Sequence, residues 1–387
     1  MERKLARLEK IKWVKPIDGA DSICLVGILG WQCVVAITAG HQVGDYVLYL
    51  EVDSLLPEDK KCFSFMEKSK YRVRTIKLRG QISQGLVINL GDLENSYSKE
   101  IVESIEKILL SGDDVSGYDL TEILGIAKYE KPVPLNMKGL VKGNFPTHLF
   151  PKTDEERIQN IPEVFKEFSG VLMYATEKLE GTSASFYFLS EEDESGSLTE
   201  RFGVCSRNLE LKIEGNESNL YVKTGLEIAK EKLKKLHKLT GMSICVQGEI
   251  VGPGIEGNLM GLDKIRFYVY NMIRIPNSRH FTYPQWRFTY AQCLAVNKIL
   301  GDDGFDLVPF YSLLYLDDYT MDGLIDEVSK FHWSIGNKSL GEGIVIRPYL
   351  DDIWWYNDSS GRPLSFKVKN NEYLLKNKEE SKQAKIE

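Results

Sequence analysis

The stretch Ala175-Thr176-Glu177-Lys178-Leu179-Glu180-Gly181-Thr182 places a lysine three residues before a glycine, just after a strand-like run over residues 172–175. A lone K-x-x-G pattern arises by chance a few times in a chain of 387 residues, so it is weak by itself. It gains strength because segments with compatible chemistry follow it in order: Ser206-Arg207-Asn208, Gly248-Glu249-Ile250, Phe267-Tyr268-Val269-Tyr270, Glu342-Gly343-Ile344-Val345-Ile346 and Ser365-Phe366-Lys367-Val368-Lys369.

The bulk composition is typical of a globular protein with two or three domains. Charged residues make up 27% and hydrophobic residues 43% of the chain. The net charge is -7, so a polynucleotide partner is not excluded but would need a local basic surface. The start Met1-Glu2-Arg3-Lys4 leads into charged sequence, and no apolar run approaches the roughly 18 residues of a membrane span. We therefore expect a soluble intracellular protein, cytoplasmic or nuclear, with no membrane partner.

The cysteines and histidines are scattered. None of the 6 cysteines forms a C-x-x-C pair, so a zinc cluster or a disulfide framework is not expected. The 5 histidines are equally dispersed and indicate no histidine-based metal site.

The first part of the chain predicts a small β-barrel. Short β-rich runs, broken by Gly, Asp and Pro, suggest strands at residues 11–14, 22–29, 32–38, 45–52, 71–78 and 85–89. An OB-type fold is the natural candidate, because it closes a short antiparallel sheet and offers one face to oligonucleotides. We expect an OB-fold nucleic-acid-binding domain over residues 1–110 and a connector over residues 111–149, part of it irregular.

The rest of the chain predicts an α+β domain over residues 150–375, with mainly antiparallel sheets and flanking helices. Strands are expected at residues 172–175, 202–205, 244–250, 267–272, 343–347 and 364–369. Apolar residues at helical spacing predict a helix over residues 220–239, and further helices are expected at 287–300 and 323–331. Residues 376–387 should form a charged, frayed tail.

Lys178 is the candidate nucleophile. Free lysine titrates near 10.4, so presenting a neutral amine at pH 7 requires about 4 to 5 kcal/mol, which nearby cationic charge can supply. The neutral amine could attack an α-phosphorus, expel pyrophosphate and hold a nucleotide as a phosphoramidate. Gly181 would allow a tight turn close to that nucleotide. The alternative is an ordinary surface lysine before a turn glycine.

Glu249 and Glu342 are single acids beside glycine in otherwise apolar strands. Buried acids are rare unless they are paired or bind a ligand, so a polar pocket is favoured. Carboxylates combined with phosphate oxygens and water suit Mg²⁺ or Mn²⁺. The alternative for each acid is a solvated strand end.

Lys367 and Lys369 alternate with Val368 and therefore leave the same face of one strand. A bound polyanion such as a triphosphate would relieve their repulsion, whereas two solvent-facing lysines are the alternative. Arg207 could clamp a phosphate of a second substrate or form a structural ion pair. Tyr270 could stack on adenine, although core packing should account for most of its aromatic run.

Together these segments resemble motifs I, III, IIIa, IV and V of the covalent nucleotidyltransferases, and most closely those of RNA ligases, over residues 150–372. The resemblance implies that Lys178 carries AMP, that Tyr270 packs on the base and that Glu249 and Glu342 bind ribose or metal. It also implies phosphate contacts from Lys367 and Lys369. The implied ATP and AMP site comprises Arg157, Glu177, Lys178, Leu179, Gly181, Arg207, Glu249, Tyr270, Glu342, Lys367 and Lys369.

Segments nearer the N-terminus resemble the Deinococcus-type, or fifth, RNA ligase family: Ile17-Asp18-Gly19-Ala20-Asp21, Gly30-Trp31-Gln32-Cys33-Val34, Lys77-Leu78-Arg79-Gly80-Gln81-Ile82-Ser83-Gln84-Gly85-Leu86 and the run from Phe150 to Asn160. This resemblance implies an ATP- and Mn-dependent enzyme that joins an RNA 3′-OH end to a 5′-phosphate RNA or DNA end. Two positions depart from the pattern: Glu180 stands where some RNA ligases have His or Asp, and Tyr270 replaces a phenylalanine.

Two other classes remain as alternatives. DNA ligases and capping enzymes normally place a further OB domain after motif V, and about 18 residues follow Lys369 here. A non-catalytic OB-fold RNA-binding protein would use the basic run Arg72, Arg74, Lys77 and Arg79, but it would be expected to lose Lys178 or Lys367. No obligate protein partner is evident.

Overall fold

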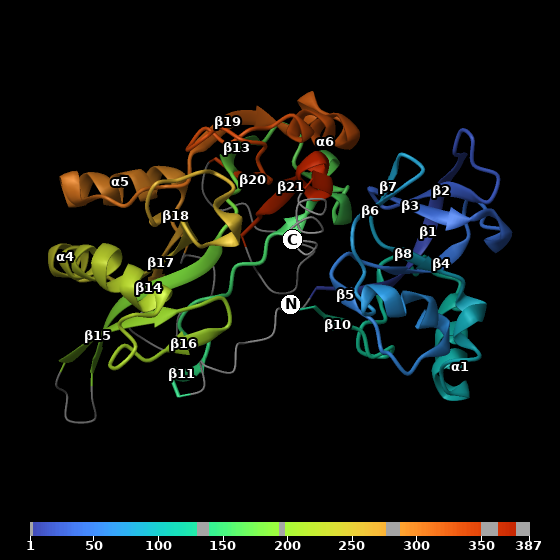
Figure 1. Cartoon of the computed structure of the whole chain (residues 1–387), viewed down its shortest axis with the longest axis horizontal. Helices are drawn as coiled ribbons and strands as arrows, with labels where there is room; N and C mark the ends of the chain where they lie inside the picture. The colour runs from blue at the N-terminus through green and yellow to red at the C-terminus, as the bar shows by residue number, and fades with distance from the viewer. Residues whose placement is uncertain (1–2, 130–138, 193–197, 276–286, 350–362, 377–387) are drawn as a thin grey trace, which may run out of the picture. The chain divides into compact units, whose positions relative to one another are not determined.

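The computed structural model describes residues 3–129, 139–192, 198–275, 287–349 and 363–376 (Figure 1). The chain forms two compact units. The first contains Met1–Pro132 together with Ile158–Glu163 and Leu374–Glu387, and the second contains Val133–Arg157 and Val164–Tyr373. This division reflects compactness and does not test function. The predicted functional boundaries at residues 110, 150 and 375 therefore stay predictions.

The first unit is built on an antiparallel sheet in the order β3-β2-β1-β4-β8, with β9 also paired to β1. One core, which includes Ile11, Val26 and Tyr49, lies on the inner side of this sheet. A second core packs beneath helix α1 through Ile105. The bounds are β1 Ala6–Pro16, β2 Ile23–Ile28, β3 Trp31–Ala36, β4 Tyr46–Leu50, β8 Leu86–Ile88, β9 Tyr118–Asp119 and α1 Lys99–Leu109.

A small hairpin lies between β4 and β8 along the chain, where the sequence predicted one long strand over residues 71–78. Only β6 (Ile76–Leu78) is a strand there, and it pairs with β7 (Gln81–Ser83). Lys70 and Tyr71 both adopt positive φ, which turns the chain and interrupts the expected run. The prediction of a single strand was therefore wrong for residues 71–75. The short strands β5 (Ser54–Leu55) and β10 (Ala127–Lys128) form a separate pair.

The second unit contains two sheets. The six-stranded sheet has the order β11-β16-β15-β14-β17-β18, and the five-stranded sheet has the order β12-β21-β20-β13-β19. All neighbours are antiparallel except β12 and β21. The bounds are β11 Val141–Asn144, β12 Glu156–Arg157, β13 Leu172–Glu177, β14 Thr182–Glu192, β15 Leu198–Cys205, β16 Leu209–Leu211, β17 Ser243–Val251, β18 Arg266–Ile275, β19 Phe310–Tyr315, β20 Gly343–Pro348 and β21 Phe366–Lys369.

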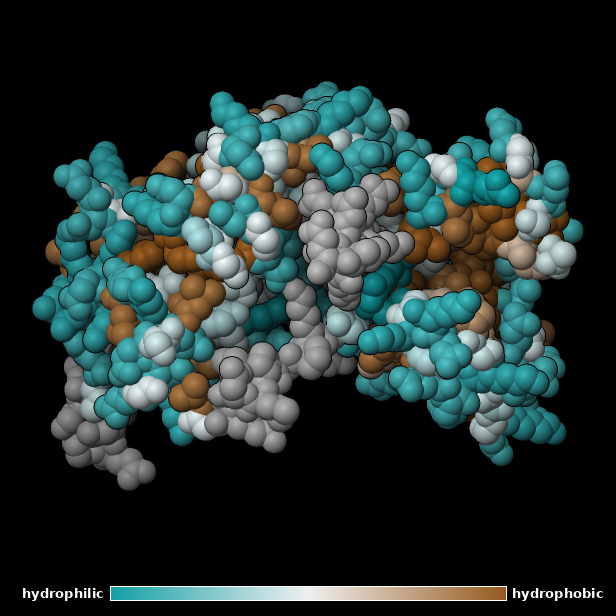
Figure 2. All heavy atoms as spheres, in the orientation of Figure 1, coloured by the Kyte–Doolittle hydropathy of each residue, from teal (hydrophilic) through white to brown (hydrophobic). Residues whose placement is uncertain are grey.

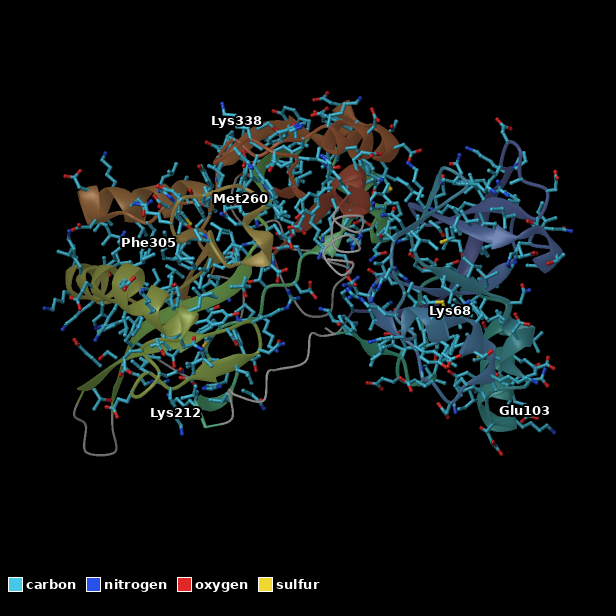
Figure 3. The ribbon with its side chains drawn as sticks, viewed as in Figure 1. Lys68, Glu103, Lys212, Met260, Phe305 and Lys338 are labelled. Atoms are coloured by element: carbon cyan, nitrogen blue, oxygen red, sulfur yellow. The ribbon has the colours of Figure 1, made fainter. Side chains whose placement is uncertain are left out.

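Helices cover one side of the six-stranded sheet, as the sequence predicted. The expected helix over residues 220–239 forms as α3 (Leu220–Thr224), a π-helical turn (Gly225–Ala229) and α4 (Lys230–Thr240). The buried ring of Phe305 lies between α4 and α5 (Tyr290–Leu300) in the main core (Figure 3). The helix α6 (Met321–Ser329) lies close to the prediction of 323–331.

The predicted motif strands all form, but the sequence missed β14, the strand after Gly181. Its start, Thr182-Ser183-Ala184-Ser185, is small and polar and does not show the apolar alternation of a half-buried strand. The tail over residues 376–387 lies outside the described part of the chain apart from Lys376. No helix in the described residues is long and apolar enough to cross a membrane.

Candidate active site

Lys178 lies directly after β13, with its backbone held from two sides. Its N–H donates to the carbonyl of Gly343 at 2.8 Å, and its carbonyl accepts from Nε1 of Trp333 at 2.8 Å. The carboxylate of Glu177 accepts the N–H of Ser334 at 3.0 Å and 3.1 Å. Leu179 is buried, so the side chains on either side of Lys178 anchor the loop while its own amine faces a polar site.

Gly181 is required by close packing against the neighbouring sheet. An added Cβ would lie closer than 3.0 Å to the backbone oxygen of Ile250 and to a methyl group of Val251. The chain passes from the five-stranded sheet into β14 of the six-stranded sheet at this point. Only a residue without a side chain allows this approach. The predicted tight turn of Gly181 beside a nucleotide stays a prediction.

Glu342 lies between two lysines that are far apart in sequence. Nζ of Lys178 donates to Oε2 of Glu342 at 2.6 Å, and Nζ of Lys369 lies 2.7 Å from Oε1. The side chain of Glu342 is 4% exposed, and those of Lys178 and Lys369 are 26% and 18% exposed. A buried acid shared by two cations is a stable arrangement only while all three charges remain.

The electrostatics of this triad follow from burial and from the opposing charges. Burial lowers the pKa of Lys178, but the carboxylates of Glu342, Glu249 and Glu180 more than offset it, so the pKa lies above its usual value. Burial would raise the pKa of Glu342, yet Lys178 and Lys369 hold it well below the ordinary range. Lys178 is therefore a protonated cation in this state.

Two further acids border the triad, and their charges are poorly compensated. Burial and the charge of Glu342 raise the pKa of Glu180 to about 8. Burial, opposed by Lys178 and assisted by Glu342, raises the pKa of Glu249 to about 7. Acids that resist ionisation near neutral pH mark a place where added positive charge would be favourable.

The lysines of β21 engage different acids. Lys369 pairs with Glu342, whereas Nζ of Lys367 lies 3.5 Å from Oδ1 of Asp154. Arg157 is buried on β12 and is register partner to Lys367 in the parallel pair with β21. The structure therefore brings three of the predicted phosphate-binding cations onto adjacent strands.

Tyr270 and Arg207 lie at the border of the same site. Tyr270 is half-buried on β18, and its hydroxyl lies 2.7 Å from Oγ of Ser183. Burial, together with the charge of Glu249, raises the pKa of Tyr270. Arg207 is exposed and pairs with Asp154 at 3.8 Å, so the structural ion pair that the sequence left open does form.

Arg347 organises this region and was missed at the sequence level. Its guanidinium is buried and donates to the carbonyl of Tyr270 at 2.9 Å, to Oγ of Ser365 at 2.9 Å and to Glu155 at 3.0 Å. It thus links the Tyr270 strand, the start of β21 and the segment before Arg157. The feature of the sequence that could have indicated this role is the position of Arg347 directly after the apolar run Ile344-Val345-Ile346.

The side chains of the site suit a divalent cation by their chemistry. In the described residues no group of three or more His, Cys, Asp or Glu side chains is arranged to hold a metal ion. Glu249 and Glu180 are nevertheless oxygen donors with poorly compensated charge. Mg²⁺ and Mn²⁺ commonly use one or two carboxylates and complete their shell with phosphate oxygens and water, so these residues fit such an ion.

Comparison with known protein families identifies the family to which this chain belongs. A family model described as RNA ligase matches residues 172–369, and one described as an OB-fold domain matches residues 5–90. This chain belongs to the RNA ligase family. A search of curated proteins found no significant relative. The match confirms the predicted enzyme class and fold, an OB-type barrel followed by an α+β catalytic domain, and does not favour the DNA ligase, capping-enzyme or non-catalytic alternatives.

Solved structures of the Naegleria gruberi RNA ligase resemble this RNA ligase over nearly its whole length. The form with PPi is 29% identical with a TM-score of 0.75, covering 98% of this chain and 100% of that chain. A mutant with ATP and Mn is 29% identical with a TM-score of 0.73, covering 96% of this chain and 98% of that chain. A mutant with AMP and Mn is 28% identical with a TM-score of 0.74 and the same coverage.

Proposed function

We propose that this RNA ligase is ATP-dependent and carries AMP on Nζ of Lys178, joining an RNA 3′-OH end to a 5′-phosphate end. The observation that supports this most is the pairing of Lys178 with Glu342, which in turn holds Lys369 of the last motif strand. The likeness to Naegleria gruberi RNA ligase forms with ATP, AMP and PPi supports the same nucleotide chemistry.

Each site residue has a proposed role that its position supports. Tyr270 stacks on adenine, a role supported by its half-buried position on β18 and by its hydroxyl beside Oγ of Ser183. Lys367, Lys369 and Arg157 bind the phosphates of ATP, and Glu177, Leu179 and Gly181 shape the loop that holds Lys178. Arg207, the most exposed of the cations, binds the phosphate of the RNA end, for which it must leave Asp154.

Activation of Lys178 requires that the balance between burial and carboxylate charge be reversed. Burial already favours the neutral amine, and the carboxylates of Glu342, Glu249 and Glu180 oppose it. Glu249 and Glu180 would hold Mn²⁺ or Mg²⁺, whose positive charge would offset those two acids and polarise the phosphates. With those charges offset, Glu342 would stay paired with Lys369, and burial would then favour the neutral amine of Lys178.

The reaction then proceeds in three balanced transfers. The neutral amine of Lys178 attacks the α-phosphorus, the bond to pyrophosphate breaks, and the amine loses its second proton to give the phosphoramidate. A 5′-phosphate oxygen next attacks that phosphorus and frees the lysine, giving an adenylated end. Finally the 3′-OH attacks the end phosphorus, a phosphodiester bond forms and AMP leaves.

Lys367, Lys369 and Arg157 stabilise the negative charge that develops on the phosphoryl oxygens during these transfers. The residues that resemble the Deinococcus-type family, including those around Gly30 and Gly80, support membership of that branch. The 5′-phosphate strand is RNA or DNA. Because ATP is an intracellular substrate, we expect the enzyme to act inside the cell, with no membrane or obligate protein partner.

The decisive experiment is the intact mass of the protein after incubation with ATP and MnCl₂. The wild type should gain the mass of AMP, and Lys178→Ala should not. Lys223→Ala, an exposed helical lysine paired with Glu227, is the matched control and should label normally. An unlabelled wild type, or an unchanged adduct on Lys178→Ala, contradicts the proposal.

A second assay tests the RNA assignment by varying the sugar at each end of a nicked duplex. A ribose 3′-OH should be joined much faster than a deoxyribose 3′-OH, whereas the 5′-phosphate side should tolerate either sugar. Equal joining of both 3′ ends contradicts the assignment.

A further inference from the structure

A carboxylate oxygen of the second unit lies between two cations that the proposed function assigns to different substrates. Oδ1 of Asp154 is 3.5 Å from Nζ of Lys367 on β21 and 3.8 Å from Nη2 of Arg207, in the loop between β15 and β16. Lys367 is proposed to bind a phosphate of ATP, and Arg207 is proposed to bind the phosphate of the RNA end. Asp154 is therefore a counter-ion that both phosphate-binding cations share.

The chain on both sides of Asp154 is held in place. Oγ1 of Thr153 donates to Oε1 of the buried Gln247 at 2.7 Å. On the other side, Glu155 pairs with the buried guanidinium of Arg347 at 3.0 Å. Lysine and arginine side chains are long and have many rotamers, so the two cations, and not Asp154, move when a phosphate binds.

The two ion pairs of Asp154 are looser than the pairs around Glu342. Both N–O distances exceed the roughly 2.7 to 3.2 Å of a hydrogen bond, whereas Nζ of Lys369 lies 2.7 Å from Glu342. The side chain of Arg207 is 54% exposed, and that of Asp154 is 27% exposed. Pairs of this kind contribute little to stability, so an incoming phosphate can displace them.

This arrangement makes the two phosphates antagonistic, although each binds a different cation. When ATP takes Lys367, Asp154 keeps Arg207, and when the RNA end takes Arg207, Asp154 keeps Lys367. With both ligands present, Asp154 loses both of these cations while it stays half-buried. Taking the opposite charges away from a partly buried carboxylate is unfavourable, so each phosphate lowers the affinity for the other.

We propose that Asp154 is a positioning residue that makes ATP and the 5′-phosphate of the RNA bind in turn and not together. While the triphosphate occupies Lys367, Asp154 holds Arg207 away from the RNA end. Once pyrophosphate has left, Lys367 pairs with Asp154 again, and Arg207 is released for the 5′-phosphate. The inference rests on the proposed function, because it takes the roles of Lys367 and Arg207 from it.

The test measures how an ATP analogue changes the affinity of the full-length enzyme for RNA. α,β-Methylene-ATP with MnCl₂ fills the nucleotide site without transferring AMP, because carbon replaces the oxygen of the bond that would break. Fluorescence anisotropy then gives the Kd of a 3′-labelled RNA of about 12 nucleotides with a 5′-phosphate. In the wild type, the analogue should weaken this binding about tenfold, and it should weaken binding of the same RNA with a 5′-OH by about twofold or less.

Asp154→Asn removes the shared charge and keeps the size of the side chain. We expect this variant to bind the analogue and the 5′-phosphorylated RNA each about two- to fivefold more tightly, because the cations no longer have to leave an ion pair. The analogue should then weaken RNA binding by about threefold or less, which leaves only the direct repulsion between the phosphates. Asp154→Glu keeps the charge and should retain most of the antagonism.

Asp303→Asn is the matched control, because it removes the charge of an exposed acid that pairs with Lys235 of α4 at 2.8 Å. Figure 2 shows hydrophilic residues along the rim of the second unit that α4 and α5 form. This variant should keep the wild-type affinities and the tenfold antagonism. Weaker binding of the analogue to Asp154→Asn, or full antagonism in that variant, would overturn the inference.

Adduct formation separates this inference from the proposed function. With ATP and MnCl₂, the wild type and Asp303→Asn should both gain the mass of AMP. A wild type without the adduct would refute the proposed function. A wild type that forms the adduct, but binds the 5′-phosphorylated RNA equally well with and without the analogue, would refute only the role of Asp154.

Discussion

The Lys178 site and the β6–β7 hairpin both carry clustered positive charge, but the cations of the site are buried and paired whereas those of the hairpin are exposed. In the site, Lys178 and Lys369 share the buried carboxylate of Glu342 at 2.6 Å and 2.7 Å. In the β6–β7 hairpin, Lys77 and Arg79 are exposed, and the described residues provide no acid to pair with them.

The contrast shows how one protein can use cations for chemistry and for binding. A buried lysine has its protonation set by its neighbours, and a change in their charge changes its reactivity. An exposed cation keeps its charge whatever its neighbours do, so it contributes affinity that salt can screen. The two regions should therefore respond differently to substitution, salt and pH.

Glu342→Gln should have the largest effect, because it removes the charge that organises the paired region while keeping its shape. We expect the rate of AMP-adduct formation to fall roughly 100-fold, since both lysines lose their common partner and the phosphates lose their alignment. Quenched-flow labelling with radioactive ATP measures this rate. Glu227→Gln, an exposed helical acid, is the control. A wild-type rate in Glu342→Gln would show that the shared pairing is not needed for catalysis.

Salt should separate the two regions directly. Raising NaCl from about 50 to about 200 mM should weaken RNA binding by roughly tenfold or more, because phosphate contacts release counterions. Adduct formation at saturating ATP should change far less, since buried pairs are screened less than exposed charges. Anisotropy and mass spectrometry on the same preparation give both numbers. A parallel fall in RNA binding and in adduct formation would contradict this difference between the two regions.

Gly181→Ala tests how much the close packing beside Lys178 contributes to stability and to adduct formation. The added methyl group meets the backbone oxygen of Ile250, and relieving such an overlap costs about 1 to 3 kcal/mol. We expect a melting temperature several degrees lower and slower adduct formation. Gly91→Ala is the control, because nothing lies within 4 Å of its added Cβ and its φ is not positive. Equal melting temperatures for the two variants would contradict the packing argument.

The smallest effect concerns pH in the absence of metal. Glu180 and Glu249 have pKa values raised from 4.5 to about 8 and about 7. The folded protein then binds more protons than the unfolded chain between these limits, so this contribution to stability is present below pH 4.5 and is lost as the pH rises toward 8. In EDTA, the melting temperature should fall by a few degrees between pH 6 and pH 8.5.

Glu180→Gln and Glu249→Gln should each reduce this pH dependence, and MnCl₂ added at pH 8.5 should restore stability to the wild type. Differential scanning fluorimetry measures all three. A melting temperature that rises with pH in EDTA would show that these acids are ionised in the folded protein at neutral pH.

Much of the site was predictable from local patterns. Glycine beside an acid in an apolar strand predicted Glu249 and Glu342, and the alternation around Val368 placed Lys367 and Lys369 on one face. The roles of Asp154 and Arg347 were not predicted, because their partners are far away in the sequence. Arg347, for example, contacts Tyr270 and Glu155, which lie 77 and 192 residues away. Nothing in their immediate sequence distinguishes them from ordinary charged residues.

The prediction of one strand over residues 71–78 was wrong for residues 71–75 for a related reason. Its composition is β-rich, but positive φ at Lys70 and Tyr71 and the pairing of β6 with β7 depend on contacts that a short window does not contain. The start of β14 shows the converse. Small polar residues form a strand there because β17 pairs with them from Thr182 onward, and β15 joins on the other side from Ser185.

By itself, the sequence determined the order of the motifs, the candidate nucleophile and the two-part organisation of the chain, because residue chemistry and strand periodicity are local properties. Tertiary structure alone decided which charges meet: that Glu342 pairs with both Lys178 and Lys369, that Asp154 pairs with Lys367, and that Lys77 and Arg79 find no acid among the described residues. The physical reason is that ion pairing depends on distance and burial, and both are set by how the sheets bring remote segments together.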